Sequence, residues 1–321
     1  MEGNPHISFD LADTKRDNAP TAHYFIDFNV FNFVASLFFT HPHICVSERI
    51  GIPLFYRELG IHKIEMVEHF QNLKDDLKSG DSALGFMKML NKINTRYALP
   101  VKDNIDFIRS IPDIIKDDSP PPLAELNDYI VAMAGGVYRY QPEEGLVFAS
   151  KPRSKTKFAL TSNLWSSSVK ALSNLFFYLK HTAKPGQLLI IDEPETHLTP
   201  QNQIILARLL AACVNQGIKV LVTTHSDYLV KEFNNLIMLH NLPEQIRATF
   251  MSRKGSPYKP GEMLNPDRVK AYICQKGGVV ACRLDQYGLE VTSMDEAIHS
   301  MNETANELVD MMEDANLGLV V

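Results

Sequence analysis

The sequence predicts an α/β fold built around a parallel sheet, and three observations lead to this prediction. Leu188–Ile191 is a short aliphatic run that ends in Asp192-Glu193, which is the pattern of a buried strand. The residues that follow, up to Gly217, have the apolar spacing of a helix. A second apolar run, Val220–Val222, ends in Thr223-Thr224-His225. Strand, helix and strand in this order predict a right-handed βαβ unit, whose two strands present their polar ends at one edge of the sheet.

Composition limits the class of protein. The 321 residues have room for one large domain or two ordinary ones, with the apolar content of a globular core. The net charge of −6 does not indicate a generic polyanion-binding surface. The four cysteines form no C-x-x-C pair, no apolar run approaches the ~20 residues of a membrane span, and residues 1–10 lack the features of a signal peptide. These features predict a cytoplasmic protein with no membrane partner, disulfide framework or zinc framework.

We expect four segments along the chain. They are N-terminal strands over residues 1–58, a helical block over 59–135, a core lobe over 136–255, and a C-terminal hairpin and helix over 256–321. The helical block is either an insertion on the sheet domain or a cover for the sheet.

In the first two segments, the period of the apolar residues predicts the elements. Alternation predicts strands over residues 6–11 and 23–31, and a third apolar run at 44–46 is also expected to be extended. Three- and four-residue steps predict helices around residues 66–73, 84–90, 105–111 and 123–133. His41-Pro42-His43 offers two metal ligands without an evident third, so we expect a loop there.

In the core lobe, turn and capping residues mark the elements. Glu143-Glu144-Gly145 predicts a hairpin, Thr199 and Ser226 are expected to cap helices, and Leu236–Leu239 is expected to form a further strand. The alternating basic residues of 151–157 predict an exposed strand with one basic face, read as a solvated hairpin edge or a nucleic-acid contact.

Asp192-Glu193 is suited to nucleotide hydrolysis. ATP hydrolysis requires Mg²⁺ on the β- and γ-phosphates and a group that orients and deprotonates the attacking water. A strand-end aspartate, here Asp192, offers oxygen ligands to Mg²⁺, and Glu193 beside it can act on the water. His225 ends the neighbouring strand, where it can hydrogen-bond the γ-phosphate or the water. An acidic pair alone often merely finishes a strand, but the histidine one crossover later favours the functional interpretation.

Ser166, Ser167 and Ser168 open a helix just upstream of the first parallel strand. Hydroxyls and free backbone N–H groups at a helix N-terminus form a phosphate-binding surface. Taken alone, these serines are more simply explained as an ordinary helix cap.

The order of these motifs resembles that of ABC-type ATPase heads. It resembles more closely the bacterial AAA-family ATPases related to the overcoming-lysogenization-defect, SMC and RecF proteins. The resemblance covers Leu160–Leu239 and rests on SSSVKAL, LLIIDEPETHLTPQNQ, GIKVLVTTHSDYLVKE and NNLIML. It is weaker for Ser47-Glu48-Arg49 and for the C-terminal hairpin and helix. It implies a P-loop NTPase-like fold, an ABC-type head sheet with flanking helices and a helical insertion. It also implies two heads that pair head to tail around ATP and Mg²⁺.

The resemblance also implies a role for each site residue. Asp192 would be the Walker B magnesium carboxylate, Glu193 the general base and His225 the switch histidine. Ser166, Ser167 and Ser168 would be the signature that touches the partner's γ-phosphate. Glu195–Thr199 would be the dimer-contacting loop, with Thr199 counted among the nucleotide-binding residues. Serine stands where many relatives carry glycine in the signature, and Thr199-Pro200 stands where close relatives often have His-Pro.

One element of such heads has no counterpart in the sequence. These proteins begin with a strand, a P-loop of the pattern G-x-x-x-x-G-K-[ST] and a helix, and none of the 16 glycines lies in that setting. We therefore expect the chain to start after the first helix of the head, at an artificial boundary, a truncated gene start or the start of a split subunit. It should bind ATP poorly alone, with the P-loop supplied by missing residues or by a partner.

Four functions fit these features to different degrees. The first is the C-terminal lobe of an ATP-hydrolysing head that switches a nucleic-acid-related or antiphage defence assembly. Such a head would act as a homodimer or with a related head, and with an effector protein. The second is a non-catalytic or truncated regulatory head, against which the intact Asp192, Glu193 and His225 argue. The third is a nuclease, but no D-x-D pattern with an upstream glutamate follows His225. The fourth is a transporter ATPase subunit, but the segment DEPETHL and the helical insertion fit the SMC-like heads better.

Overall fold

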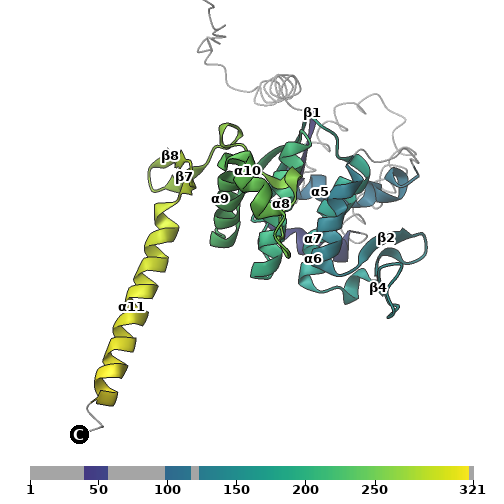
Figure 1. The fold of residues 1–321 in the computed structure, drawn as a ribbon. Helices are drawn as coiled ribbons and strands as arrows, with labels where there is room; N and C mark the ends of the chain where they lie inside the picture. The colour runs from purple at the N-terminus through teal and green to yellow at the C-terminus, as the bar shows by residue number, and fades with distance from the viewer. Residues whose placement is uncertain (1–39, 57–97, 117–122, 318–321) are drawn as a thin grey trace, which may run out of the picture. The chain divides into compact units, whose positions relative to one another are not determined.

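The computed structural model describes residues 40–56, 98–116 and 123–317, and Figure 1 gives its fold. The chain divides into two compact units, Met1–His41 and Pro42–Val321. Apart from Thr40 and His41 at the start of the first strand, the features discussed below concern the second unit.

Some predicted elements lie outside the described residues. They are the strands expected over 6–11 and 23–31 and the helices expected over 66–73 and 84–90. Most of the expected segment 1–58 therefore lies outside as well, and the four segment boundaries remain predictions.

A three-stranded sheet carries the predicted βαβ unit. Its strands β1 (Thr40–Cys45), β5 (Gln187–Asp192) and β6 (Lys219–Thr223) lie in the order β1-β5-β6. Strands β5 and β6 are parallel, with Asp192 opposite Thr223, and α8 (Pro200–Asn215) connects them. The prediction of two parallel strands with their polar ends at one edge is confirmed.

The boundaries of α8 follow from its terminal residues. The Thr199 hydroxyl accepts a hydrogen bond from the Asn202 N–H at 3.4 Å, and Pro200 occupies a first-turn position that needs no N–H donor. Gly217 follows the helix with φ of +87°, in the left-handed region that favours glycine. The predicted start and end of this helix are confirmed.

The other strands in the described ranges form three smaller antiparallel pairings. They are the sheet of β2 (Val137–Gln141), β3 (Gly145–Ala149) and β4 (Ala159–Thr161), the hairpin of β7 (Tyr272–Gln275) and β8 (Gly278–Ala281), and the pair β9 (Arg283–Asp285) and β10 (Gly288–Glu290). The hairpin predicted at Glu143-Glu144-Gly145 is present, and β7 and β8 form the hairpin expected in the C-terminal segment.

Helices make up most of the rest. They are η1 (Ser47–Ile50), α2 (Ile52–Phe55), α5 (Leu99–Ile114), η3 (Ala124–Leu126), α6 (Asn127–Ala134), η4 (Ser162–Leu164), α7 (Ser167–Phe177), the π-helix η5 (Tyr178–Thr182), α9 (Asp227–Asn241), α10 (Glu244–Met251), η6 (Pro260–Glu262), η7 (Pro266–Arg268) and α11 (Thr292–Leu317). Figure 1 shows α8 and α9 side by side. No helix in the described ranges is both long and apolar enough to cross a membrane.

One apolar core joins the sheet to the helical block. Ile105, Ile108 and Ile111 of α5 and Ile130 of α6 are buried in the same cluster as Leu189 of β5. Each such side chain contributes about 1.5–3 kcal/mol when it leaves water. The described part of the helical block therefore covers the sheet core, which favours the covering interpretation for α5 and α6.

The strand predicted over Leu236–Leu239 is wrong, because these residues lie inside α9. No glycine or proline interrupts the chain from the cap Ser226 to Pro243, so the helix continues through the run. Leu236, Ile237 and Leu239 are instead buried in a second cluster with Leu264, while Met238 is exposed. A short apolar run does not by itself distinguish a strand from a buried turn of helix.

The basic strand predicted over 151–157 is also wrong. Strand β3 ends at Ala149, and residues 150–158 form a loop closed by a 3.0 Å hydrogen bond from the Ser150 N–H to the Phe158 carbonyl. Pro152 has no N–H to offer a neighbouring strand. The four basic side chains of this loop are all exposed.

The loop predicted at His41-Pro42-His43 is part of β1 instead. The His43 ring stacks on Tyr178 with centroids 4.0 Å apart, and its Nε2 donates to the Asn174 side-chain oxygen at 2.7 Å. Asn174 in turn donates to the side-chain oxygen of Asn104 at 2.9 Å. His43 is thus a partly buried residue with a satisfied hydrogen bond.

We predict that His43 makes the fold sensitive to acid. Burial disfavours the imidazolium and lowers the pKa of His43 from 6.5 to about 4, although the hydrogen bond to Asn174 opposes this shift. The unfolded chain therefore binds the proton first, and stability is complete above pH 6.5 and lost as the pH falls through 6.5 towards 4. Between pH 7 and 4.5 the loss should be about 2 kcal/mol, from 1.36 kcal/mol per pKa unit.

Urea unfolding at both pH values measures this loss. His43→Gln keeps a donor for Asn174 but does not titrate, so the variant should lose about 2 kcal/mol less than the parent protein over the same pH interval. His299→Gln, on the exposed surface of α11, is the control. Equal pH dependence of all three proteins would contradict the prediction.

Candidate functional site

The ends of β5 and β6 bring together three of the predicted site residues. His225 Nε2 lies 4.0 Å from Glu193 Oε1, and Asp192 directly precedes Glu193 at the end of β5. The side chain of His225 is 89% exposed and that of Glu193 is 41% exposed. Asp192, Glu193 and His225 therefore form one polar group that faces solvent.

Thr223 fixes both acidic residues, and the sequence analysis did not single it out. Its hydroxyl donates to Asp192 Oδ1 at 2.5 Å, and the Glu193 N–H points to both the hydroxyl and the carbonyl of Thr223 at 3.1 Å. The parallel register explains these contacts, since Thr223 is the residue opposite Asp192. Both strands were predicted from the sequence, but their register is known only from the structure.

Glu193 has an unusual backbone conformation. Its φ is +45°, in the left-handed region that residues other than glycine, asparagine and aspartate rarely adopt. Such a conformation costs of the order of 1–3 kcal/mol and persists only where surrounding contacts impose it. Glu193 Oε2 also accepts a hydrogen bond from the Thr196 hydroxyl at 3.2 Å. The chain thus turns sharply at Glu193, with its backbone and side chain both held.

Glu195 connects the turn after β5 to the end of β6. Its Oε1 accepts a hydrogen bond from the backbone N–H of His225 at 2.6 Å. Its Oε2 is buried and has no hydrogen-bond partner among the residues the structure describes. The resemblance placed Glu195 only in a dimer-contacting loop, but here its carboxylate positions the backbone of His225.

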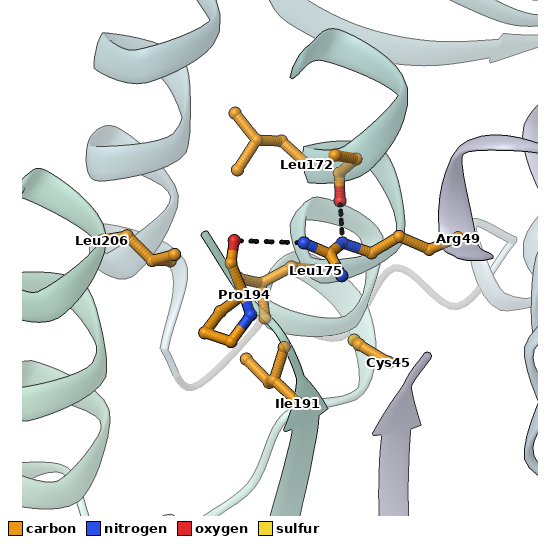
Figure 2. A pocket seen from close by; sticks show the side chains of 8 residues that line it. Cys45, Arg49, Leu172, Leu175, Ile191, Pro194 and Leu206 are labelled. Carbon is orange, nitrogen blue, oxygen red and sulfur yellow. Dashed lines mark hydrogen bonds between the residues drawn. The ribbon is translucent and has the colours of Figure 1, made fainter. Parts of the chain in front are cut away.

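A buried arginine holds the same turn from the protein interior. Arg49 of η1 is only 4% exposed. Its guanidinium donates to five backbone carbonyls: Nη1 to Val46 (3.2 Å) and Asp192 (3.0 Å), Nη2 to Glu193 and Pro194 (both 3.0 Å), and Nε to Ala171 (3.2 Å). Figure 2 shows the side chain reaching between α7 and Pro194. A guanidinium has five N–H donors, so every donor of Arg49 is used.

Among the residues that the structure describes, the charge of Arg49 is held by carbonyl dipoles rather than by an ion pair with a carboxylate. Burial lowers the pKa of Arg49, while Cys45 and then the carboxylates of Glu195, Asp192 and Glu193 oppose that shift. Arginine nevertheless stays protonated in proteins. The cavity beside it, lined mainly by apolar side chains, measures about 10 Å³, which is room for about one water. It is not a ligand pocket, so a substrate would bind on the exposed side of the turn.

The three predicted serines lie together at the start of α7. Ser166 is the N-cap, and its hydroxyl accepts from the Val169 N–H at 3.3 Å and lies 3.1 Å from the Ser168 hydroxyl. Ser167 is exposed in the first turn. Arg49 links this helix to the turn after β5, because it donates to Ala171 of α7 as well as to Asp192. The buried Arg49 thus contacts both the helix that carries the serines and the turn that carries the acidic residues.

The structure gives Thr199 a different role from these residues. Its hydroxyl caps α8, and Leu198 before it is buried in the main core. The cap explains the residue without a ligand. A contact of Thr199 with nucleotide remains a prediction.

The donor set fits Mg²⁺ brought in with a nucleotide. Asp192 Oδ1 accepts from Thr223, so Oδ2 remains to bind the ion or one of its waters. In the described ranges, no group of three or more His, Cys, Asp or Glu side chains could hold a metal ion. Mg²⁺ usually takes only one or two carboxylates and completes its shell with water and phosphate oxygens.

A comparison with protein families gives one match. The profile of the AAA ATPase domain matches residues 61–230, or 170 of the 321 residues. The matched range contains β5, α8, β6 and all the candidate site residues except Arg49. No curated protein matches the chain significantly.

Solved structures give several weaker similarities. A structure from work on ATP-driven dimerization and DNA-stimulated activation of SMC ATPases is 16% identical, with a TM-score of 0.33, and the alignment covers 63% of this chain and 97% of that one. The SMC head domain from Thermotoga maritima is 20% identical (TM-score 0.26, 39% and 44% covered). The Smc head domain bound to the C-terminal domain of ScpA, from Pyrococcus furiosus, is 18% identical (TM-score 0.26, 66% and 49% covered). The chain thus spans less than half of the last two structures. At these TM-scores we transfer no residue correspondence.

We predict that Arg49 is essential for the stability of the turn after β5. Arg49→Gln removes the charge and at least three donors, leaving buried carbonyls unpaired, and should lower the free energy of unfolding by about 3 kcal/mol or more. Arg49→Lys keeps the charge but has only three donors and no planar fork, so its loss should be smaller.

Urea unfolding measures both losses. Arg139→Gln, at an exposed position of β2, is the matched control and should change stability by no more than about 0.5 kcal/mol. The prediction fails if Arg49→Gln is as mild as this control.

Proposed function

The chain belongs to the AAA ATPase domain family, and from that premise we propose that it is the C-terminal lobe of an ABC-type ATPase head. In this proposal the lobe binds and hydrolyses ATP with Mg²⁺ at a head-to-tail dimer interface. The observation that carries the proposal is the grouping of Asp192, Glu193 and His225 at the ends of two parallel strands, where α/β sheets bind their ligands.

Each acidic residue has a task set by its position. Mg²⁺ bound with the nucleotide would neutralise charge on the β- and γ-phosphate oxygens. Asp192 would hold it through Oδ2, since Thr223 occupies and orients Oδ1. Glu193 would accept a proton from the attacking water, because the left-handed turn directs the residue out of the strand and Thr196 holds one of its oxygens.

His225 would complete the water site. The 4.0 Å between its Nε2 and Glu193 Oε1 is longer than a direct hydrogen bond, so an oxygen beside the pair could contact both groups. Such an oxygen could belong to the attacking water or to the γ-phosphate. Glu195 fixes the backbone at His225 and so limits how far the imidazole can move from Glu193.

A second surface would close the site. Glu193 and His225 face solvent, and Ser166, Ser167 and Ser168 sit at a helix N-terminus where phosphate oxygens bind well. We propose that the serines contact the nucleotide held by a second copy or a related head, and that Glu195–Thr199 lies at that contact. No G-x-x-x-x-G-K-[ST] pattern occurs in the 321 residues, so the P-loop would come from outside them.

The wider setting of this cycle is a further part of the proposal. On the motif resemblance alone, the head would act as the ATP-gated switch of a nucleic-acid-related or antiphage defence complex of the overcoming-lysogenization-defect type, with an effector protein as partner. The exposed basic side chains of the 151–157 loop keep nucleic acid among the candidate partners.

A non-catalytic head is the second candidate, and one observation favours it. Without a P-loop pattern, these residues could serve only to complete and regulate the site of a partner. Thr223, Arg49 and Glu195 hold the turn and the strand ends that carry the exposed acidic residues and His225. These contacts add nothing to the apolar core, so they weigh against a loss of catalytic function.

We predict that ATP turnover requires both a P-loop and Glu193. The chain alone should be inert, whereas the product of its genomic locus read upstream of Met1 should hydrolyse ATP. Glu193→Gln should reduce that turnover by at least about 100-fold, in the range typical for a general base. Release of phosphate is the measurement, and Glu144→Gln, on the exposed turn between β2 and β3, is the control.

Two results would contradict these assignments. Turnover by the chain alone that Glu193→Gln abolishes would mean that a phosphate loop of another pattern lies within the 321 residues. Turnover by the longer product that survives Glu193→Gln would exclude Glu193 as the base.

A further inference from the structure

The helix α10 borders an open groove. The groove has a volume of about 280 Å³, which is below the range of about 300–1,000 Å³ typical of small-molecule sites. Its lining runs from the end of α9 along α10: Leu242, Gln245, Ile246, Thr249, Phe250 and Arg253. Ile246 is 56% exposed, and no residue of α10 is buried. The groove therefore fits the side chains of a docking helix better than a free small molecule.

Basic residues lie at one end of this groove. Arg253 lines it, with the guanidinium carbon 5.1 Å from the centre of the Phe250 ring, and Lys254 follows directly. Both basic side chains are exposed, and in the described ranges neither pairs with a carboxylate. From Glu244 to Lys254 the sequence has three basic residues and one acidic residue. The groove thus favours a partner that joins an apolar face to acidic side chains.

The helix α11 has an apolar face without a partner (Figure 1). It has 26 residues, a length of about 39 Å at 1.5 Å per residue. Met301, Leu308 and Met312 lie at the seven- and four-residue steps of one helix face, and every described side chain from 299 to 313 is exposed. Neither apolar cluster of the described chain includes a residue of α11. A helix owes most of its stability to packing of its apolar face, so this face calls for a partner.

The charges of α11 indicate the nature of that partner. The helix has seven acidic residues and no Lys or Arg, so a second α11 would be repelled and a basic surface attracted. Glu303 and Glu307 are four residues apart and form a row that runs beside the row of Leu308 and Met312. We call Glu303 and Glu307 the acidic edge of α11. An apolar face with an acidic edge is what the α10 groove favours.

The two surfaces belong to one chain but do not meet within it. The groove at α10 is open, and the described side chains of α11 are exposed over 299–313. The surfaces are complementary in apolar character and opposite in charge, so two copies can satisfy both at once. If each copy places its α11 in the groove of the other, the pair is closed and twofold symmetric, the commonest form of homo-oligomer.

We propose that α11 of one copy of this chain docks in the α10 groove of a second copy. Leu308 and Met312 pack against Ile246, and the flexible methionine side chain adapts to the shape of the groove. The acidic edge lies beside Arg253 and Lys254. This contact uses no residue of the nucleotide site, so it forms without ATP and does not depend on the proposed ATPase function.

The test is the molar mass of the full chain in solution without nucleotide, by light scattering after size exclusion over a range of concentrations. We expect twice the chain mass of 36.2 kDa for the parent protein. Ile246→Glu places a carboxylate in the groove against an apolar and acidic partner, and should raise the dissociation constant of the dimer by at least about 100-fold.

Charge reversal identifies the two surfaces. Arg253→Glu with Lys254→Glu, or Glu303→Lys with Glu307→Lys, should raise the dissociation constant by at least about 10-fold, because like charges then face each other. The protein with all four substitutions should regain most of the parent affinity, since opposite charges meet again. Asp310→Lys changes an exposed residue on the side of α11 away from Leu308, and this matched control should leave the affinity within about 2-fold of the parent.

Folding of each variant can be checked independently. Trp165 is the single tryptophan of the chain, is 3% exposed in the main core and donates its indole N–H to the Leu160 carbonyl at 2.8 Å. Its fluorescence should be the same in the parent and in every variant, since neither α10 nor α11 contributes to that core.

Three results would overturn the proposal. The first is a parent protein that is monomeric at every concentration, as expected if a different molecule, or α11 of the same chain, occupies the groove. The second is a dimer whose affinity the four combined substitutions fail to restore. The third is a dimer weakened as much by Asp310→Lys as by reversal of the acidic edge, which would mean that net charge and not this contact controls the association.

Discussion

The buried guanidinium of Arg49 is the contact on which the candidate site depends. Its five donors meet five backbone carbonyls, three of them on consecutive residues from Asp192 to Pro194. Consecutive carbonyls converge on one point only if the chain turns sharply, and Glu193 provides that turn with its positive φ. The cost of the left-handed backbone is thus offset inside the protein, where water does not compete for the same carbonyls. The fourth carbonyl, of Ala171, brings the serine helix into the same arrangement.

The residues that hold the site in place differ from the exposed groups that would contact a ligand. Arg49 holds the backbone of the turn from the interior, and Thr223 and Glu195 hold the ends of the two strands from the surface side. Asp192 Oδ2, Glu193 Oε1 and the imidazole of His225 remain directed to solvent or to a ligand. A reacting group gains most from side chains that are already in position when the substrate arrives, because no free energy is then needed to order them.

The sequence predicted the parts of the fold whose signals are local. The βαβ unit, the caps Thr199 and Ser226 and the hairpin at Gly145 follow from apolar period and turn residues, and each is present. The strand expected at Leu236 failed because a four-residue apolar run carries no period of its own. Arg49, Thr223 and Glu195 could not be assigned roles from spacing, since each acts through a partner 30 to 145 residues away. Only the register of β5 and β6, once known, places Thr223 opposite Asp192.

The charge of the exposed site indicates what a second surface would have to supply. Asp192, Glu193 and Glu195 place three carboxylates around one turn, and the cation beside them, Arg49, has no donor left for a ligand. A triphosphate approaching this face would meet like charges at short range, an interaction of several kcal/mol where water is excluded. Mg²⁺ would offset part of it. The remainder needs N–H donors and a cation from a P-loop, together with the serine hydroxyls of a facing α7. Under the proposed function, the described face would form one side of a shared nucleotide site, with groups that could activate water and few that could bind phosphate.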